Sequence, residues 1–94
     1  MMTLDNTITI KDTIFTQVVD EEMVILDPDS GAYFGLDETG AVIWQHLSES
    51  GSLQEVYDAM YAIYDVDSEQ LEADICRFVQ ELVDARLVEV ASSI

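Results

Sequence analysis

Apolar and polar residues alternate in the first part of the chain and recur every three to four residues in the rest. The alternating part contains three short runs rich in β-branched and aromatic residues, Ile14–Val19, Met23–Asp27 and Ala32–Leu36. Turn-forming residues separate these runs at Asp20–Glu22 and Pro28–Gly31. The pattern predicts three antiparallel strands joined as a meander.

The periodic part predicts three helices. We expect them over Glu38–Ser48, over Leu53–Tyr64, and from Asp67 or Ser68 to about Ala85. Asp37 is a favourable N-cap residue for the first helix. Ser52 and Glu55 form a capping-box pattern at the start of the second. Strands followed by helices indicate an α+β fold.

The two flanks of this pattern are less regular. Thr7–Ile10 alternates, and it either extends the first strand or belongs to a flexible arm with residues 1–7. Arg86–Val90 follows the last helix and is expected to leave it as an extended tail. A chain of 94 residues forms one small domain, so we assign residues 1–94 to a single domain.

The charge restricts the kinds of partner. The chain has twenty acidic residues and only three basic ones, Lys11, Arg77 and Arg86, so its formal net charge is −17. Nucleic acids and anionic membranes are normally bound by clustered lysine and arginine, so we expect neither as a partner. Basic or neutral partners are favoured. The alternative, that the acidity only keeps the protein in solution, stays open.

The cellular compartment is expected to be the cytoplasm. Cys76 is the only cysteine, so no internal disulfide can form. The first residues lack the basic start and apolar run of a signal peptide. No apolar run approaches the roughly 20 residues that span a bilayer.

Three acidic residues have the spacing of a calcium loop. Asp27, Asp29 and Glu38 occupy positions one, three and twelve of a window. An EF-hand loop needs glycine at its sixth position and an oxygen ligand at its fifth, where this chain has Ala32 and Gly31. A turn and the first turn of a helix explain the acidic residues, so we predict no metal site.

Catalytic motifs are missing from the sequence. His46 is the only histidine and has no evident pairing with Cys76, and zinc spacings, phosphate loops and nucleophile elbows are absent. We therefore predict no catalytic residues, no cofactor and no enzyme activity. A sheet edge can instead bind an extended peptide as an added strand. Gly31 and Gly35 leave small positions for such an approach, or serve only a turn or a bulge.

A series of short motifs runs through most of the chain. It comprises Leu26 with the turn through Gly31, Tyr33, Leu36-Asp37, Gly40, Ile43-Trp44, Gly51, Tyr64–Asp67, Asp74, Phe78, Leu82 and Leu87-Val88. In order and spacing over residues 8–90 it resembles the PqqD-like family. These are RiPP recognition elements, which bind the leader peptides of ribosomally made, modified natural products. The family usually has Leu-Asn where this chain has Leu36-Asp37. The net charge of this chain is also unusually negative for the family.

The resemblance implies a winged helix-turn-helix-like fold, with a three-stranded antiparallel sheet followed by three helices. The leader would lie as a fourth, antiparallel strand on the third strand, in the groove beside the third helix. The protein would act as a peptide chaperone without activity of its own. It would present the precursor to a modifying enzyme, such as a radical-SAM enzyme, or to a leader peptidase. Stand-alone members serve pyrroloquinoline quinone and lasso-peptide pathways.

The candidate peptide-binding residues lie on these two elements. They are Gly31, Ala32, Tyr33, Phe34, Gly35 and Leu36 on the third strand, and Asp74, Arg77, Phe78 and Glu81 on the third helix. Strand alternation places Phe34 and Leu36 toward the helices and Tyr33 outward. Each helix residue also has a structural interpretation. Phe78 could be core, Asp74 a solvated surface residue, and Arg77 a partner of Asp74 or Glu81.

Other functions stay open at this point. An accessory subunit would bind only its enzyme and no peptide. DNA binding would need basic residues on the recognition helix, where only Arg77 is available. The tyrosines Tyr57, Tyr61 and Tyr64 form either the rim of the core or a surface for the enzyme or a second copy. A homodimer with swapped N-terminal arms is a further option.

Overall fold

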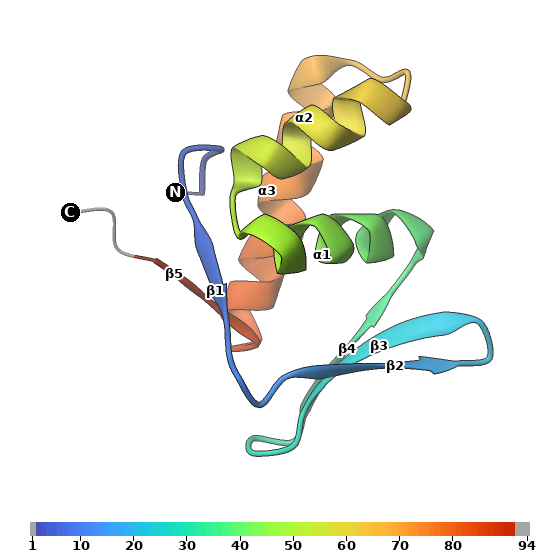
Figure 1. Ribbon diagram of the computed structural model, residues 1–94, viewed down its shortest axis with the longest axis vertical. Coiled ribbons are helices and arrows are strands. Elements are labelled where there is room, and N and C mark those ends of the chain that lie inside the picture. Colours follow the sequence, from blue (N-terminus) through green and yellow to red (C-terminus); the bar gives the residue numbers. More distant parts are fainter. Residues whose placement is uncertain (1, 92–94) are drawn as a thin grey trace.

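The computed structural model describes residues 2–91 of the protein (Figure 1). Its elements are β1 (Ile8–Ile10), β2 (Phe15–Val19), β3 (Glu22–Asp27), β4 (Ala32–Leu36), α1 (Glu38–Ser50), α2 (Leu53–Ile63), α3 (Ser68–Asp84) and β5 (Val88–Val90). The expected α+β order, a three-stranded sheet followed by three helices, is confirmed. The element boundaries agree with the expected ones to within about two residues.

The strands β2, β3 and β4 form the antiparallel sheet, with β3 in the middle. Ile25 of β3 pairs with Thr16 of β2 and with Phe34 of β4. Both outer strands are edges of this sheet. In Figure 1 the β2–β3 hairpin extends beneath the start of α1, while β4 rises from the turn and leads into that helix.

A second sheet, which the sequence pattern did not indicate, joins the two ends of the chain. β1 pairs antiparallel with β5, Ile8 opposite Val90 and Ile10 opposite Val88. The expectation that Thr7–Ile10 extends the first strand was therefore wrong. The extended conformation expected within Arg86–Val90 is confirmed for Val88–Val90, which is a paired strand and not a tail. The pairing is favoured because Ile8 and Val88 are buried in the core.

The end of α3 turns the chain back toward β1. Arg86 adopts a left-handed conformation with φ of 64°. The N–H of Arg86 donates to the carbonyl of Val83, and that of Leu87 to the carbonyl of Leu82, at 2.9 and 3.1 Å. This is the Schellman motif, which ends helices and reverses the chain. It places Leu87, fully buried, back into the core.

The N-terminal residues 2–7 contact the helical part. Met2 and Leu4 are half-buried and pack against the core. Thr7 forms a β-bridge with Ser52, and the N–H of Ile8 donates to the carbonyl of Gly51 at 2.7 Å. The flexibility expected of residues 1–7 stays a prediction.

The core lies between the sheet and the three helices. Its most deeply buried side chains are Ile25, Leu47, Leu53, Val56, Met60, Ile75, Val79, Leu82, Leu87 and Val88. On α2 and α3 these buried residues recur at helical spacing, as the periodicity predicted, with Leu53, Val56 and Met60 on α2 and Ile75, Val79 and Leu82 on α3. Within residues 2–91 no helix has the length and apolar character needed to cross a membrane.

Each helix begins at the predicted capping residue. The Asp37 carboxylate accepts from the N–H of Gly40 at 2.7 Å, so aspartate replaces the usual family asparagine without loss of the cap. The Ser52 hydroxyl accepts from the N–H of Glu55 at 3.3 Å. Asp67 accepts from the N–H of Glu69 at 2.8 Å. These bonds satisfy backbone donors that have no partner inside the helix.

The β2–β3 turn has an unusual composition for its geometry. Only Asp20 and Glu21 separate the paired residues Val19 and Glu22, and their φ angles are 51° and 70°. Two-residue turns with both φ values positive favour Asn-Gly or Asp-Gly. A left-handed residue with a side chain costs roughly 1–2 kcal/mol, so Glu21 holds strain that glycine would release.

We predict that Glu21→Gly raises the free energy of unfolding by about 0.5–1 kcal/mol, which is the strain minus the entropy lost by glycine. Glu22→Gly is the matched control. It is the same substitution at the next residue, which lies inside β3 and not in the turn. It should lower stability by roughly 0.5–1 kcal/mol. Urea unfolding of the two variants checks both signs, and a less stable Glu21→Gly protein contradicts the strain.

Candidate functional site

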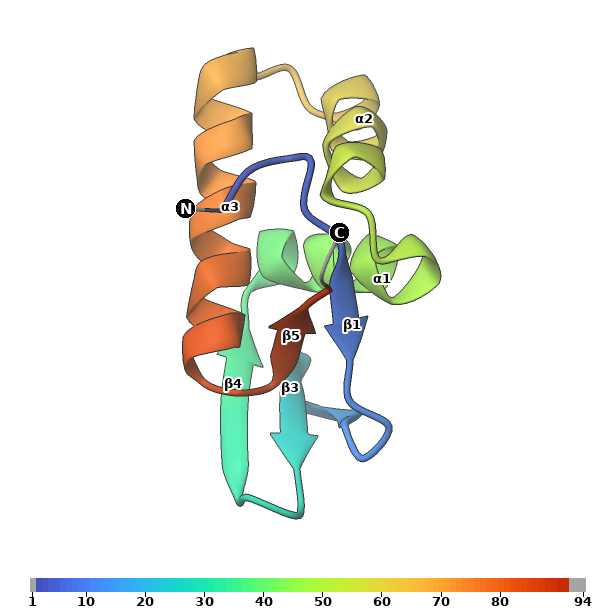
Figure 2. The same ribbon diagram turned by 90° about the vertical axis from the view of Figure 1, so that its left-hand side faces the viewer.

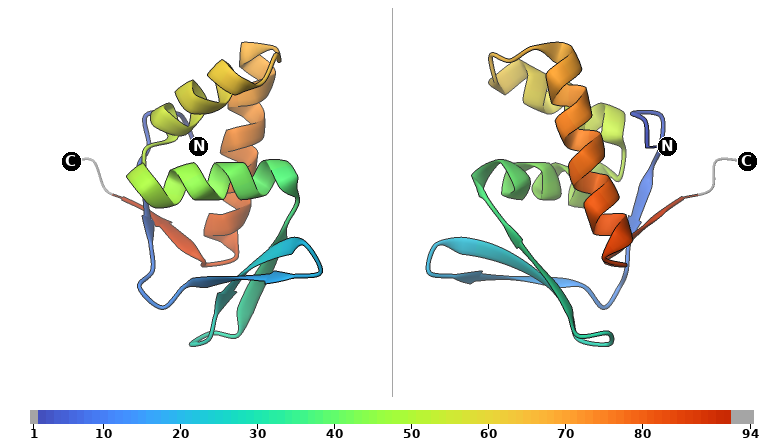
Figure 3. Two further views of the ribbon diagram at one scale, coloured as in Figure 1. Left: turned by 45° about the vertical axis from the view of Figure 1, so that its right-hand side comes forward. Right: turned by 180° about the vertical axis from the view of Figure 1, so that it is seen from behind.

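β4 is an edge strand that lies next to α3. It pairs with β3 on one side, and no other strand of residues 2–91 pairs with it. Figure 2 and the right view of Figure 3 show β4 at the outer side of the sheet, near the C-terminal half of α3. Alternate backbone N–H and C=O groups of an edge strand point away from the sheet, so this edge can accept another strand.

The side chains of β4 alternate between two faces, as predicted. Tyr33 is 73% exposed and Gly35 is exposed, whereas Phe34 is half-buried and Leu36 is 5% exposed. Leu36 packs in the core between the sheet and the helices. The strand therefore holds one apolar face against the helices and presents Tyr33 to solvent.

Phe34 meets Phe78 of α3 edge to face. The two ring centroids are 6.0 Å apart and the ring planes are inclined by 83°. Phe78 is half-buried and packs against the core. Both interpretations of Phe78 thus hold in part, because it packs in the core and also lies beside the edge strand. The contact joins the two elements that the sequence assigned to the peptide groove.

Gly40 makes room for this ring. A Cβ atom at position 40 would lie 3.1 Å from Cε1 of Phe78 and 3.2 Å from the capping oxygen of Asp37. Both distances are shorter than ordinary van der Waals contacts. Glycine in the first turn of α1 therefore lets Phe78 pack under the helix start. The sequence analysis used Gly40 only as part of a family motif and missed this contact.

The polar candidates on α3 lie around Phe78. Arg77 donates to a carboxylate oxygen of Asp74 at 3.3 Å, which confirms their pairing, and Gln70 donates to the same oxygen at 2.8 Å. The Arg77 side chain is 74% exposed, so this ion pair adds little stability. Glu81 is exposed. Asp74 and Glu81 lie one helical turn before and after Phe78.

These placements give the site a simple chemistry. Its centre is apolar, formed by Phe34 and Phe78, and its helix side is acidic apart from Arg77. The open main chain of β4 provides hydrogen bonds along one side. An extended peptide with an apolar side chain and neighbouring polar or basic groups would complement this arrangement.

The turn before β4 is held by a buried carboxylate. Asp27 has no exposed surface and accepts four hydrogen bonds. The donors are the Ser30 hydroxyl at 3.0 Å, the Thr13 hydroxyl and the Asp29 N–H, both at 3.1 Å, and the Lys11 ammonium at 3.4 Å. Asp27 is thus a turn residue, as expected. Its burial was missed, because a turn pattern contains no information about Lys11 and Thr13.

Burial by itself raises the pKa of Asp27. The hydrogen bonds from Ser30, Thr13, Asp29 and Lys11 favour the charged form and together outweigh burial, so the pKa lies below its usual value. Within residues 2–91 no group of three or more acidic, histidine or cysteine side chains is arranged to hold a metal ion.

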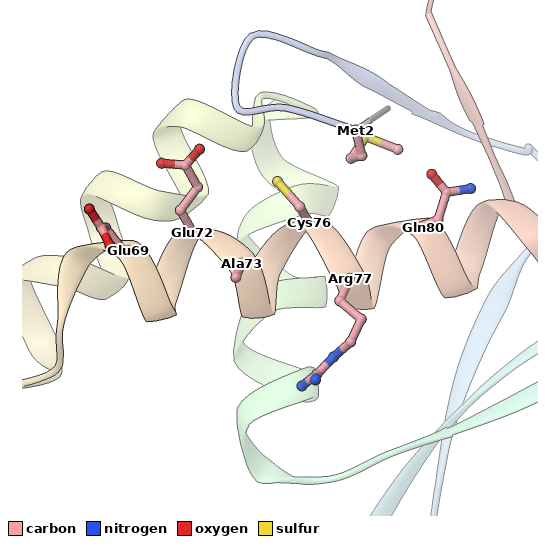
Figure 4. A pocket seen from close by; sticks show the side chains of 7 residues that line it. All are labelled: Met2, Glu69, Glu72, Ala73, Cys76, Arg77 and Gln80. Carbon is pink, nitrogen blue, oxygen red and sulfur yellow. The ribbon is translucent and has the colours of Figure 1, made fainter.

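A hollow runs along α3. Its lining residues are Met2, Glu69, Glu72, Ala73, Cys76, Arg77 and Gln80 (Figure 4). Arg77, a candidate peptide-binding residue, therefore also borders this hollow. Cys76 is half-buried. Burial and the Glu72 charge raise the pKa of its thiol, so the reactive thiolate is disfavoured.

The tyrosines of α2 lie at the margin of the core. Tyr57 and Tyr64 are half-buried and pack against it, as the rim interpretation predicted. Tyr61 is 52% exposed and stacks on Tyr57, with ring centroids 5.7 Å apart. Tyr64 lines a hollow together with Gln70 and Asp74 of α3, so this end of α2 borders a candidate residue of the site.

The three-stranded antiparallel sheet followed by three helices defines a small α+β domain with an open sheet edge beside α3. The sequence model of the family described as coenzyme PQQ synthesis protein D (PqqD) matches residues 22–88. The chain belongs to this family. Comparison with curated proteins finds none that matches.

Two solved structures are similar over nearly their whole length. "TbiB1 in complex with the TbiA(beta) leader peptide" has a TM-score of 0.79 and 35% identity, over 90% of this chain and 99% of that one. "Lasso peptide synthetase B1 complexed with the leader peptide" has a TM-score of 0.78 and 29% identity, over 88% and 98%.

We predict that the Phe34–Phe78 contact couples β4 to α3 energetically. A double-mutant cycle with Phe34→Ala and Phe78→Ala should give a coupling free energy of about 0.5–1.5 kcal/mol in unfolding experiments. Phe34→Ala with Tyr61→Ala is the control pair, because these two rings have no contact with each other. Their effects on the free energy of unfolding should add. A coupling near zero for Phe34 and Phe78 contradicts the contact.

We also predict an acid-sensitive stability that depends on Asp27. A carboxyl whose pKa is lowered by folding stabilises the protein above its unfolded pKa, and this contribution disappears as the pH falls through the folded pKa. The stability difference between wild type and Asp27→Asn should therefore shrink below about pH 4. Asp29→Asn is the control on the same turn. A difference that is independent of pH contradicts the account.

Proposed function

We propose that this protein binds the leader region of a ribosomally made precursor peptide. The leader adds as an antiparallel strand to the open edge of β4, alongside α3. The observation that carries this proposal is the unpaired edge of β4 held beside Phe78. The two similar structures, which are complexes with leader peptides, support it.

The main chain and the side chains of the candidate residues make different contributions to leader binding. Main-chain groups of Gly31–Leu36 supply hydrogen bonds, which give affinity with little dependence on the leader sequence. Phe34 and Phe78 form the apolar floor that receives a leader side chain. Tyr33 is exposed along the path of the peptide.

The charged residues of α3 would select the leader. Asp74 and Glu81 favour basic or polar leader residues on either side of the apolar contact, and Arg77 is available for one acidic group. Charge pairs at such a rim mainly affect the association rate and the choice of partner.

The protein then presents the bound precursor to a separate enzyme in the cytoplasm, either a modifying enzyme or a leader peptidase. We infer that residues 1–94 act as one recognition domain without chemistry of their own. Holding the leader keeps the rest of the precursor near the enzyme, which raises its effective concentration there.

Proline substitutions test the added strand. Neighbouring N–H groups of an edge strand point alternately to the sheet and to the open edge. Of Tyr33→Pro and Phe34→Pro, one therefore removes a donor for the leader and the other breaks the bond to β3. We expect the variant that keeps the wild-type melting temperature to bind the leader at least roughly tenfold more weakly.

The measurement is fluorescence anisotropy with a labelled synthetic leader from the precursor gene next to this one. Tyr61→Ala on α2 is the control and should leave leader affinity unchanged. Alanine is used there because proline would break the helix. Unchanged leader affinity in the proline variant that keeps the wild-type melting temperature excludes strand addition. If wild type then bound the neighbouring enzyme but no leader, the protein would be an accessory subunit.

A further inference from the structure

β2, the second edge of the sheet, is unusually apolar and exposed. Phe15 is 46% exposed, Val18 67% and Val19 49%. The run Ile14–Val19 carries no charge, although 24% of the chain is charged. Proteins usually protect such edges with lysine, proline or a covering element, because an exposed apolar edge pairs with other chains. β2 has none of these in residues 2–91.

A hollow lies next to β2, between the β2–β3 hairpin and α1. Its floor is apolar, made of Val18, Met23, Leu36, Ala41 and Val42. Four carboxylates stand around it, from Glu21, Glu22, Asp37 and Glu38, together with Gln45. We call the residues that line this hollow the β2–α1 face. Phe15 and Val19 alternate with Val18 along β2 and lie on the other face of the sheet. Figure 1 and the left view of Figure 3 show the hairpin beneath the start of α1.

No basic residue of this chain neutralises the acidic rim. The chain has three, and Lys11 pairs with Asp27 while Arg77 pairs with Asp74. Arg86 lines a different hollow, beside Val83 and Glu89. Four like charges around an apolar floor repel one another, and a bound cation-bearing partner would relieve this repulsion.

Glu21 adds an independent sign of function. It stands in a left-handed conformation that glycine would adopt without strain. The strained residue carries one of the four rim carboxylates. A side chain kept at an energetic cost in an exposed turn is consistent with a contact made outside this chain.

We propose that the β2–α1 face is the docking surface for the enzyme to which the leader is presented. The partner presents an apolar segment flanked by lysine or arginine, with the apolar part on Val18, Met23 and Val42 and the basic groups on the rim. This proposal rests on the proposed function for the presence of an enzyme. Its location and chemistry rest on the exposure and charge of the face itself.

A second copy of this chain fits the face poorly. Antiparallel pairing of two β2 strands would bring Asp20–Glu22 of one copy near Asp12 of the other, and the neighbouring basic residue, Lys11, is already paired with Asp27. The four rim carboxylates would also be buried against a molecule of net charge −17. Uncompensated burial of like charges is costly, so a basic partner is favoured.

The two surfaces can be occupied at the same time. β2 and β4 are opposite edges of the sheet, separated by β3. A leader on β4 therefore leaves the edge of β2 free. Simultaneous binding would hold the precursor and the enzyme on one small domain, which is what a presenting protein requires.

The test measures two affinities for each variant by titration calorimetry. One is for the synthetic leader, and the other is for the purified enzyme whose gene neighbours that of this chain. Val18→Ser and the double variant Glu21→Gln/Glu38→Gln should each weaken enzyme binding at least roughly tenfold and leave leader binding within twofold. Added salt should weaken wild-type enzyme binding, and less so that of the double variant.

The matched controls are the same types of substitution at positions outside the β2–α1 face. Val66→Ser removes an exposed valine outside the face, and Glu72→Gln removes an exposed carboxylate on α3. Both should bind the enzyme like wild type. Glu21→Gly should weaken enzyme binding while raising the melting temperature by a few degrees, which separates docking from folding.

The outcomes distinguish this proposal from the function it rests on. Unchanged enzyme affinity in Val18→Ser and the double variant overturns the docking surface, and leader binding would still support the proposed function. A wild-type protein that binds no leader overturns the proposed function, whatever the enzyme data show. A wild-type dimer in sedimentation that Val18→Ser dissociates overturns the choice of partner, because the face would then bind a second copy.

Discussion

The edge-to-face contact of Phe34 with Phe78 holds the edge strand β4 beside α3, and the candidate site depends on it. Three local features within residues 27–40 support this contact with the distant Phe78. Strand alternation turns Phe34 toward the helices, Gly40 leaves space for the Phe78 ring, and Asp27 holds the turn before β4. The open main chain of β4 is useful for binding only while this arrangement fixes its position.

The strong negative charge is managed in two different ways. The one buried carboxylate, Asp27, is compensated by four donors. On the β2–α1 face the carboxylates surround exposed apolar side chains and have no cation of this chain beside them. Asp37 caps α1 and Glu38 lies in its first turn, so the uncompensated charge of this face comes mainly from Glu21 and Glu22, and the proposed basic partner would neutralise it.

Local patterns in the sequence were sufficient for most elements. Alternation located β2, β3 and β4, periodicity and capping residues located the helices, and the two faces of β4 followed from them. The pairing of β1 with β5 was missed because it joins two three-residue strands from opposite ends of the chain. The sequence also did not predict the close approach of Phe78 to Gly40 or the left-handed conformation of Glu21. Tertiary packing and turn geometry produce no periodic pattern of apolar residues.

An amide NMR titration with the synthetic leader tests the central claim, strand addition to β4, most directly. The account predicts saturable shifts in Gly31–Leu36 and along Asp74–Glu81, with amides of β4 becoming protected from exchange as they join the new strand pair. Shifts confined to Phe15–Val19, or none at millimolar leader with a folded protein, would contradict it.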